Sequence, residues 1–267
     1  MTAGDILVVK VGGSLMEKVS SVIATLKAAA SSPDCAFEKI ILVPGGGIFA
    51  DEVRKLNADD ETSHWMAILA MEKFGYMISA LGIPAVDGFE DCLSGADGAS
   101  CANSINSINS INSINSINSA NAAKLLLLLP YRIMREYDPL PHSWDITSDS
   151  IAAWAAAALS ERIAGGEPRV SLLLLKSVDG IRFRSHETSR GAHVSNAAEN
   201  SETNPLIIPE IREIREGETF EEVDPCCIPL ILKSGLDGYI LNAAKPQVLT
   251  DFICGRNFSG TRIHRYP

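Results

Sequence analysis

Two glycine-rich turns in the sequence each follow directly on a short apolar run. The first run ends in Lys10-Val11-Gly12-Gly13-Ser14 and the second in Pro44-Gly45-Gly46-Gly47. Because glycine lacks a Cβ, backbone N–H groups in such turns can approach a phosphate closely, and the helix start that follows favours an anion. Lys10 can place its ammonium against the same phosphate. The two turns together predict one site for two phosphate-bearing groups.

Neither turn is a standard nucleotide-binding signature. The chain contains no GxxxxGK[ST] and no GxGxxG pattern. A lysine followed by two glycines is also common in an ordinary strand–helix turn with a surface lysine. It is the presence of two such turns, early in the chain, that favours a phosphate site over a coincidence of tight turns.

A third polar segment, residues 142–150, leads into a predicted helix. Thr147 or Ser148 suits the N-cap of that helix and Asp149 suits its first turn. Capping alone would explain this composition. A carboxylate at position 149 could also hold the ammonium of Lys10 in a fixed direction, with its charge on a transferred phosphoryl group. Both interpretations stay open at this point.

Short apolar runs alternate with helix-length segments along most of the chain. We expect strands at residues 6–11, 40–43, 125–129, 170–175, 239–241 and 261–263. We expect helices at residues 16–30, 48–56, 62–81, 148–164 and 246–254. The main strand runs are continuously apolar, which is typical of parallel strands covered by helices on both faces. The pattern predicts a three-layer α/β/α fold with a mostly parallel central sheet.

Two segments fall outside this alternation. Residues 103–119 repeat Asn-Ser-Ile with a period of three, which matches neither the helical period of 3.6 nor the strand period of 2. We interpret them as a low-complexity surface insert, with an added strand or a partner-binding segment as the alternative. Residues 185–204 are rich in Ser, Asn, Glu and His, and we expect them to be an exposed excursion between strands.

The overall composition limits the kinds of partner and the cellular compartment that we expect. The formal net charge is −10 over 267 residues, which argues against a nucleic-acid partner because phosphate backbones require a basic face. The longest apolar run, residues 151–159, is too short to cross a membrane. The N-terminus shows no basic export signal, and the six cysteines form no CxxC pair. We therefore expect a cytoplasmic chain with reduced thiols, no membrane partner and no nucleic-acid partner.

These three segments, in this order, resemble the amino acid kinase family. The finer detail is similar to a branch of that family that acts in methanofuran biosynthesis and phosphorylates the phosphate of [5-(aminomethyl)furan-3-yl]methyl phosphate to give a diphosphate. This closer resemblance rests on residues 43–51, 64–71, 140–145 and 147–154. It implies an ATP-dependent kinase whose partners are ATP and a small-molecule phosphate.

The resemblance also implies roles for individual residues. It makes Lys10 and Asp149 catalytic, and it assigns ATP binding to Lys10, Gly12, Gly13, Ser14, Lys176, Asp179 and Gly180. It assigns the acceptor to Gly45, Gly46, Gly47, Asp145, Thr147 and Ser148, to which we add Arg54 as a cation for a second phosphate. Mg²⁺ is the expected cofactor besides ATP, held by phosphates and water, so no residue is predicted as a metal ligand. An aminomethyl group would need an acidic or aromatic partner, and Asp51, Asp145, His142 and Trp144 are candidates.

The chain departs from the family pattern mainly on the nucleotide side. Ser177 stands where Asp or Lys is common, Arg182 replaces an aromatic residue, and Ala243 replaces a glycine. The second, C-terminal lysine of the family is either Lys233 or Lys245. These departures concern the contacts to adenosine more than those to the phosphates.

Other readings of the same fold stay open. The acceptor could be a nucleotide, as in uridylate kinases, or an amino acid, and the fold is also used to store molybdate or tungstate. We expect a single domain over residues 1–267, with an acceptor-binding lobe (1–165) and a nucleotide-binding lobe (166–267). The predicted helix at residues 62–81 could form an interface, and we expect a homo-oligomer.

Overall fold

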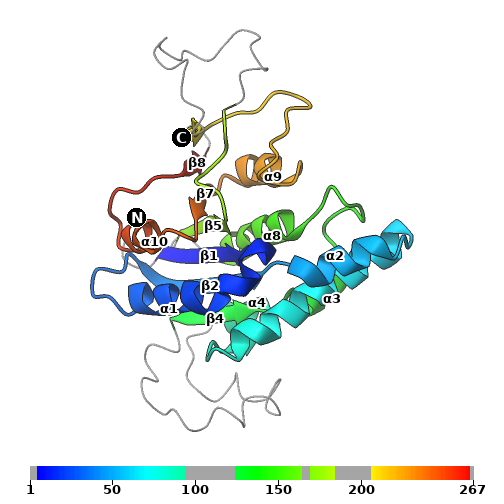
Figure 1. The fold of residues 1–267 in the computed structure, drawn as a ribbon, viewed down its shortest axis with the longest axis horizontal. Coiled ribbons are helices and arrows are strands. Elements are labelled where there is room, and N and C mark those ends of the chain that lie inside the picture. Colours follow the sequence, from blue (N-terminus) through cyan, green and yellow to red (C-terminus); the bar gives the residue numbers. More distant parts are fainter. Residues whose placement is uncertain (1–4, 94–123, 164–168, 184–205, 265–267) are drawn as a thin grey trace.

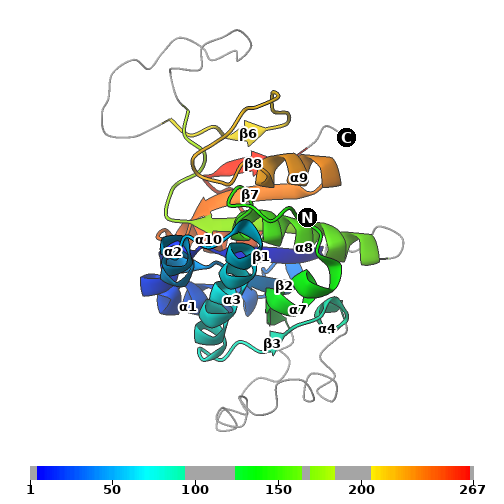
Figure 2. The same cartoon turned by 90° about the vertical axis from the view of Figure 1, so that its right-hand side faces the viewer.

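One eight-stranded sheet organises the protein, with helices packed on both of its faces (Figures 1 and 2). The structure is a computed structural model that describes residues 5–93, 124–163, 169–183 and 206–264. The strand order is β3-β4-β2-β1-β5-β7-β8-β6. The strands are β1 (Asp5–Val11), β2 (Phe37–Pro44), β3 (Ala85–Val86), β4 (Leu125–Leu128), β5 (Val170–Lys176), β6 (Glu210–Ile211), β7 (Asp237–Asn242) and β8 (Thr261–Ile263). Among these strands, only the β7–β8 pair is antiparallel, so the predicted mostly parallel sheet is confirmed.

The helices of the described chain include one 3₁₀ segment, η1. They are η1 (Gly13–Lys18), α1 (Val19–Ala30), α2 (Gly47–Lys55), α3 (Asp60–Ser79), α4 (Phe89–Leu93), α7 (Pro130–Tyr137), α8 (Ser148–Arg162), α9 (Cys227–Ser234) and α10 (Pro246–Ile253). The α2–α3 pair extends beyond the carboxyl end of β1 (Figure 1). Within the described chain, no helix is both long and apolar enough to span a lipid bilayer.

The core is split into two layers by the sheet. Ile6 and Val8 of β1 pack in a cluster with α8 and α9, whereas Leu7, Val9 and Val11 pack on the opposite face with α1 and α10. Since alternate side chains of a strand point to opposite faces, a strand covered on both sides must be apolar throughout. This explains the unbroken apolar runs in the sequence. Lys10 interrupts that rule, and it is only 4% exposed.

The sequence predicted the long elements and missed the short ones. The six predicted strands are present, and the five predicted helices are present with shifted ends; the first of them begins as η1 before becoming α1. Sequence reasoning did not find β3, β6, α4, α7 or α9, of which β3 and β6 have two residues each. Strands of two residues are too short to show a period. The predicted insert at 103–119 and the excursion at 185–204 lie outside the described residues.

The two glycine turns meet because β1 and β2 are parallel neighbours. Val11 pairs with Pro44 at the ends of these strands, so both turns leave the same edge of the sheet side by side. A Cβ on Gly13 would lie 2.2 Å from the backbone nitrogen of Gly47, whose φ is +54°. A Cβ on Gly45 would lie 2.6 Å from the nitrogen of Gly13. No side chain fits between the turns, so glycine is needed at these positions.

Replacing Gly13 by alanine should therefore destabilise the fold itself. We expect Gly13→Ala to lower the free energy of unfolding by roughly 2–3 kcal/mol, because the new methyl group meets backbone atoms that cannot turn away. Gly88→Ala is the matched control, since its Cβ would come no closer than 3.3 Å to the end of the Asp91 side chain. Urea unfolding of both variants measures the difference. Equal midpoints for Gly13→Ala and Gly88→Ala would contradict the close approach of the turns.

Candidate active site

A buried carboxylate shared by two lysines lies at the carboxyl end of the central strands. The Asp149 side chain, from the first turn of α8, places Oδ1 2.8 Å from Nζ of Lys10 on β1. Its Oδ2 accepts a hydrogen bond from Nζ of Lys176, the last residue of β5. The three side chains are 4%, 6% and 14% exposed, in the order Asp149, Lys10, Lys176. This charge centre is two cations and one anion, so it carries a net positive charge suited to an anion.

The electrostatics of the charge centre keep Asp149 ionised. Burial alone would raise the pKa of Asp149, but the charges of Lys10 and Lys176 and their hydrogen bonds hold it below its usual value. The pKa of Lys176 is lowered by burial first and by the charge of Lys10 second, against the opposing effect of Asp149. An anion bound beside Lys176 would raise the pKa of Lys176 and so favour its charged form.

The charge centre opens into a cleft of about 440 Å³. Of the residues predicted for the site, those that line it are Lys10, Gly13, Ser14, Gly46, Gly47, Asp51, Arg54, Trp144, Thr147, Ser148, Asp149 and Lys176. The cleft therefore combines both glycine turns, the start of α8 and the buried lysines. The first amides of η1 and α2 have no partner within their own helices, so they can donate to an anion in this cleft.

The remaining predicted residues lie behind or away from the cleft wall. The amide of Gly12 donates to the carbonyl oxygen of Leu175 (3.1 Å), and the amide of Gly45 donates to that of Val11 (2.9 Å). These two glycines hold the turns against the sheet with their own N–H groups. Asp145 is exposed, and neither it nor His142 is part of the cleft lining.

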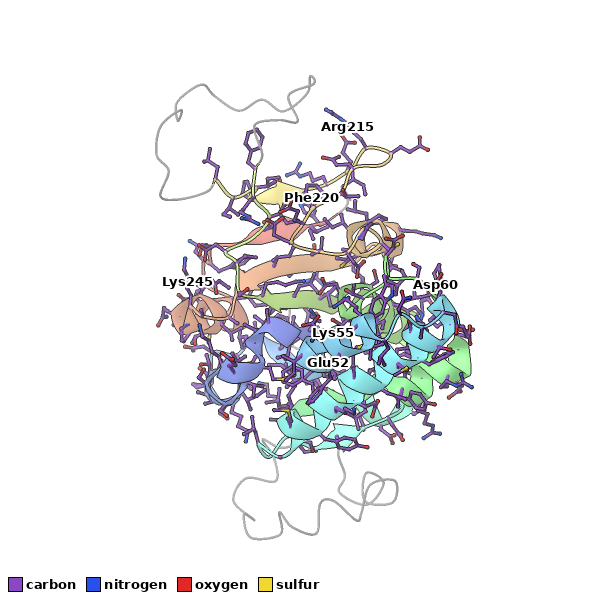
Figure 3. All side chains as sticks on the ribbon, turned by 45° about the vertical axis from the view of Figure 1, so that its right-hand side comes forward. Glu52, Lys55, Asp60, Arg215, Phe220 and Lys245 are labelled. Carbon is purple, nitrogen blue, oxygen red and sulfur yellow. The ribbon has the colours of Figure 1, made fainter. Side chains whose placement is uncertain are left out.

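Asp179 and Gly180 lie apart from this cleft lining, beyond the end of β5. The Asp179 carboxylate accepts from the side-chain amide of Asn242 (2.9 Å) and pairs with Nζ of Lys245 (2.6 Å). Lys245 stands at the start of α10, well apart from Asp60 on α3 in Figure 3. The other candidate lysine, Lys233, is exposed in the last turn of α9. Of these two lysines, Lys245 is the one that pairs with a predicted ATP-binding residue.

Asp224 is a residue that sequence reasoning missed. Its carboxylate accepts from the backbone N–H and hydroxyl of Thr147 (3.0 and 2.8 Å), and from the N–H of Ser150 (3.0 Å) and of Cys226 (3.1 Å). The Ser150 hydroxyl donates to it as well. Asp224 thus anchors the N-terminus of α8 and fixes Asp149 in position. No local pattern indicates this role, because Asp224 lies 77 residues from Thr147.

Arg54, predicted as a cation for the acceptor, is partly engaged by neighbours. Its guanidinium lies 4.7 Å from the centre of the Trp144 ring and 2.7 Å from Oδ1 of Asp51. The Arg54 side chain is 47% exposed, so the pair with Asp51 is solvated and weak. Arg54 can therefore turn toward an anion at little cost, while Trp144 provides an aromatic surface on the same side of the cleft.

Comparison with known proteins places this geometry in context. The chain is 26% identical over 262 residues to [5-(aminomethyl)furan-3-yl]methyl phosphate kinase of Methanocaldococcus jannaschii, covering 96% of each protein. The fold is similar to uridylate kinase from Archaeoglobus fulgidus, with TM-score 0.56 and 14% identity over 96% of this chain and 98% of that one. UMP kinase from Ureaplasma parvum gives TM-score 0.54 and 14% identity, over 99% and 100% of the two chains. These structural likenesses show the fold alone.

A match to one protein family covers strands β1 to β5 and the three residues of the charge centre. Residues 5–190 match the model of the amino acid kinase family, and this range contains Lys10, both glycine turns, Asp149 and Lys176. The resemblance inferred from the sequence motifs is confirmed. The chain therefore belongs to the amino acid kinase family and is a phosphotransferase.

Proposed function

We propose that this protein transfers the γ-phosphoryl group of ATP to the phosphate of a small phosphate monoester. The observation that carries the proposal is the Lys10–Asp149–Lys176 charge centre at the base of a cleft where two glycine turns meet. Phosphoryl transfer passes through a loose transition state, so positioning and charge neutralisation are the main tasks of the protein. Two buried ammonium groups beside free backbone amides supply both.

The charges of the reacting groups suit the charge centre. An oxygen of the acceptor phosphate attacks the γ-phosphorus of ATP, the bond between that phosphorus and the β,γ-bridging oxygen breaks, and ADP leaves. Because the acceptor oxygen is already anionic, no proton has to be removed from it. Asp149 is a poor general base, since each of its oxygens contacts an ammonium group. This favours an anionic acceptor over an alcohol.

We assign Lys10 to the transferred phosphoryl group, with Asp149 as the residue that positions it. The amides of Gly13 and Ser14 would hold ATP phosphates, and those of Gly46 and Gly47 the acceptor phosphate. Mg²⁺ would neutralise ATP charge in transfer, and the saturation of Asp149 by two lysines fits an ion held by phosphates and water instead of by that carboxylate. Lys176, Asp179 and Gly180 would bind the nucleotide, and all three belong to the proposed nucleotide-binding lobe (166–267).

We further propose [5-(aminomethyl)furan-3-yl]methyl phosphate as the acceptor. The support is the similarity to the Methanocaldococcus jannaschii enzyme that carries this name, which extends over 96% of both chains. It includes the segments that line the acceptor side of the cleft, namely α2, α3 and the start of α8.

An acceptor panel tests this assignment. We expect purified protein with ATP and Mg²⁺ to form ADP when [5-(aminomethyl)furan-3-yl]methyl phosphate is added, and to turn over UMP and isopentenyl phosphate at least about 100-fold more slowly, measured as kcat/KM. The product should contain a diphosphate by phosphorus NMR. Turnover of UMP or isopentenyl phosphate alone would reject the furan acceptor and keep the kinase.

The role of Lys10 is tested by substitution. We expect Lys10→Ala to lower kcat by about 100-fold or more, because the variant loses a buried cation at the transferred group. Lys55→Ala is the control, since Lys55 is exposed and pairs with Glu52 outside the cleft lining. Circular dichroism melting should show that Lys10→Ala remains folded. A rate near that of Lys55→Ala would remove Lys10 from the mechanism.

We also propose that the protein is a homo-oligomer that pairs through α3. Leu69, Tyr76 and Met77 are exposed on one face of this helix, at 44%, 44% and 41%. An antiparallel pairing of α3 from two copies about a two-fold axis would bury these three side chains against the same face of the other copy. Such a two-fold contact uses the same apolar surface of both copies.

Light scattering after size-exclusion chromatography measures the oligomeric state. We expect at least twice the mass of the 267-residue chain, and we expect Leu69→Glu combined with Met77→Glu to reduce it to that of the monomer. Leu56→Glu is the control, because Leu56 is 60% exposed at the end of α2 and away from this face. A monomeric mass for the unmodified protein would refute the pairing.

A further inference from the structure

Away from the charge centre, the lining of the cleft is acidic. Its ionisable side chains there are Glu17, Asp51, Arg54 and Asp60, with His64 beside them. Arg54 is paired with Asp51, which leaves an excess of negative charge on this part of the wall. The cleft is therefore positive at its base and negative elsewhere. A ligand that matches it has an anionic group at one end and a cationic group at the other.

One face of α3 forms part of this acidic wall. The residues of α3 that line the cleft are Asp60, Ser63, His64, Ala67, Ile68 and Met71, at the spacing of a single helix face. Asp60 and His64 are one turn apart at the outer end of this helix, where Figure 3 labels Asp60. The inner part of the same face is apolar. The charged and hydrogen-bonding side chains of this face thus lie at the N-terminal end of α3.

Asp60 is not needed to cap its own helix. Asp59 is the N-cap, accepting from the N–H of Thr62 at 2.9 Å. In the described part of the chain, Asp60 has no hydrogen bond or ion pair, whereas its neighbour Glu61 accepts from the indole N–H of Trp65 (2.7 Å). A carboxylate with no partner on the wall of a cleft is available to a cationic ligand.

His64 provides the second and independent observation. Its side chain is buried, at 6% exposure, and its Nε2 has no hydrogen-bond partner within the described residues. Buried polar atoms without a partner are costly and uncommon in folded proteins. Because His64 also lines the cleft, a bound ligand is the natural source of the missing partner.

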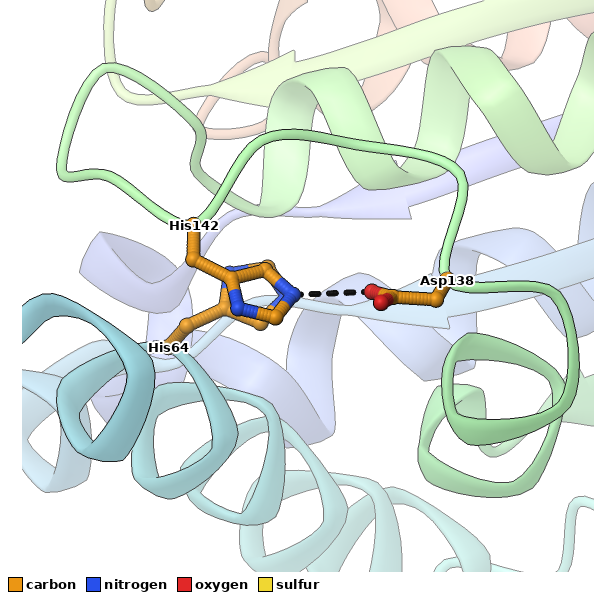
Figure 4. A group of neighbouring side chains, drawn as sticks. All are labelled: His64, Asp138 and His142. Atoms are coloured by element: carbon orange, nitrogen blue, oxygen red, sulfur yellow. Dashed lines mark hydrogen bonds and ion pairs between the residues drawn. The ribbon is translucent and has the colours of Figure 1, made fainter.

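The surroundings of His64 keep its ring neutral. His64 stacks on His142, with ring centres 4.1 Å apart, and His142 contacts the carboxylate of Asp138 (Figure 4). The other ring nitrogen of His142 contacts the carboxylate of Glu61. Burial lowers the pKa of His64, and the charge of His142 lowers it further. A neutral imidazole can offer a lone pair at Nε2 to an N–H donor.

A metal ion does not account for this cluster. One nitrogen or oxygen from each of His64, Asp138 and His142 lies within 4.8 Å of the others. The two rings, however, are stacked at an interplanar angle of 19°, so their lone pairs lie in nearly parallel planes and cannot converge on one ion. Both nitrogens of His142 also already contact carboxylates.

We propose that Asp60 and His64 form an ammonium subsite, in which the carboxylate of Asp60 supplies the charge and Nε2 of His64 accepts a hydrogen bond from a primary amine of the acceptor. The phosphate of the same acceptor then points to the charge centre. This inference rests on the proposed function and specifies the class of acceptor, which is a phosphate monoester with a cationic amine at its other end. Trp144, which also lines the cleft, would provide a flat surface for the ring between the two groups.

Two acceptors that differ in one group test the subsite. They are [5-(aminomethyl)furan-3-yl]methyl phosphate and its hydroxymethyl analogue, which lacks the positive charge. We expect the unmodified protein to prefer the amine by at least about tenfold in kcat/KM, because hydrogen bonds to charged groups are the stronger ones. Asp60→Asn and His64→Phe should each bring this preference to within about twofold of unity, mainly through KM for the amine.

The design separates the subsite from the fold and from the kinase activity. His64→Phe retains a ring to stack on His142, and Glu52→Gln is the control, since Glu52 is exposed, pairs with Lys55 and lies outside the cleft lining. Glu52→Gln should keep the full preference for the amine. Equal kcat/KM for the two acceptors with the unmodified protein, or an undiminished preference in Asp60→Asn, would overturn the subsite.

If neither furan phosphate is phosphorylated, the proposed furan acceptor fails, and equilibrium binding then decides on the subsite. Calorimetric titration with the same two compounds should still show tighter binding of the amine, weakened by Asp60→Asn. Absent or equal binding would overturn the subsite as well.

Discussion

The buried carboxylate of Asp149, shared between Lys10 and Lys176, is the interaction on which the rest of the site depends. Two ammonium groups side by side repel each other strongly where water is excluded. The carboxylate between them makes their proximity tolerable and leaves one positive charge in excess. Such buried ions contribute little to stability. We infer that they are retained because a charged substrate completes the group.

The sheet and α8 together bring the three side chains of the charge centre into contact. β1 and β5 are adjacent parallel strands, with Lys10 opposite Leu174, so Lys10 and Lys176 lie at the same end of the sheet. The alanine-rich segment of α8 is buried against the same strands, which brings its first turn over that end. Asp224 then holds the N-terminus of α8 by bonds to Thr147 and Ser150. A carboxylate that is not part of the cleft lining thus determines where the Asp149 carboxylate lies.

Sequence reasoning reached the parts of the site that are local along the chain. A glycine turn after an apolar strand and a carboxylate in the first turn of a helix are patterns within a few residues, and the parallel sheet brings their ends together. The pairing of Lys10 with Asp149 was foreseen as one of two interpretations. The partner of Lys176 was not, because Lys176 was assigned to ATP by resemblance and its contact depends on how closely α8 approaches β5. Asp224 and His64 carry no local signal, since their partners are set by tertiary packing.

The net charge of the protein determines where the attraction for a phosphate ligand can come from. A chain with a formal charge of −10 repels polyphosphates at a distance, and salt screens such long-range fields within about 8 Å at physiological ionic strength. Attraction therefore has to come from cations inside the cleft, where screening by ions is weak. Because screening is weak there, the acidic wall and the basic floor of the cleft together favour one orientation of a bipolar acceptor. Each end of a bipolar acceptor then interacts chiefly with the group it touches, and orientation follows from the order of charges along the cleft wall.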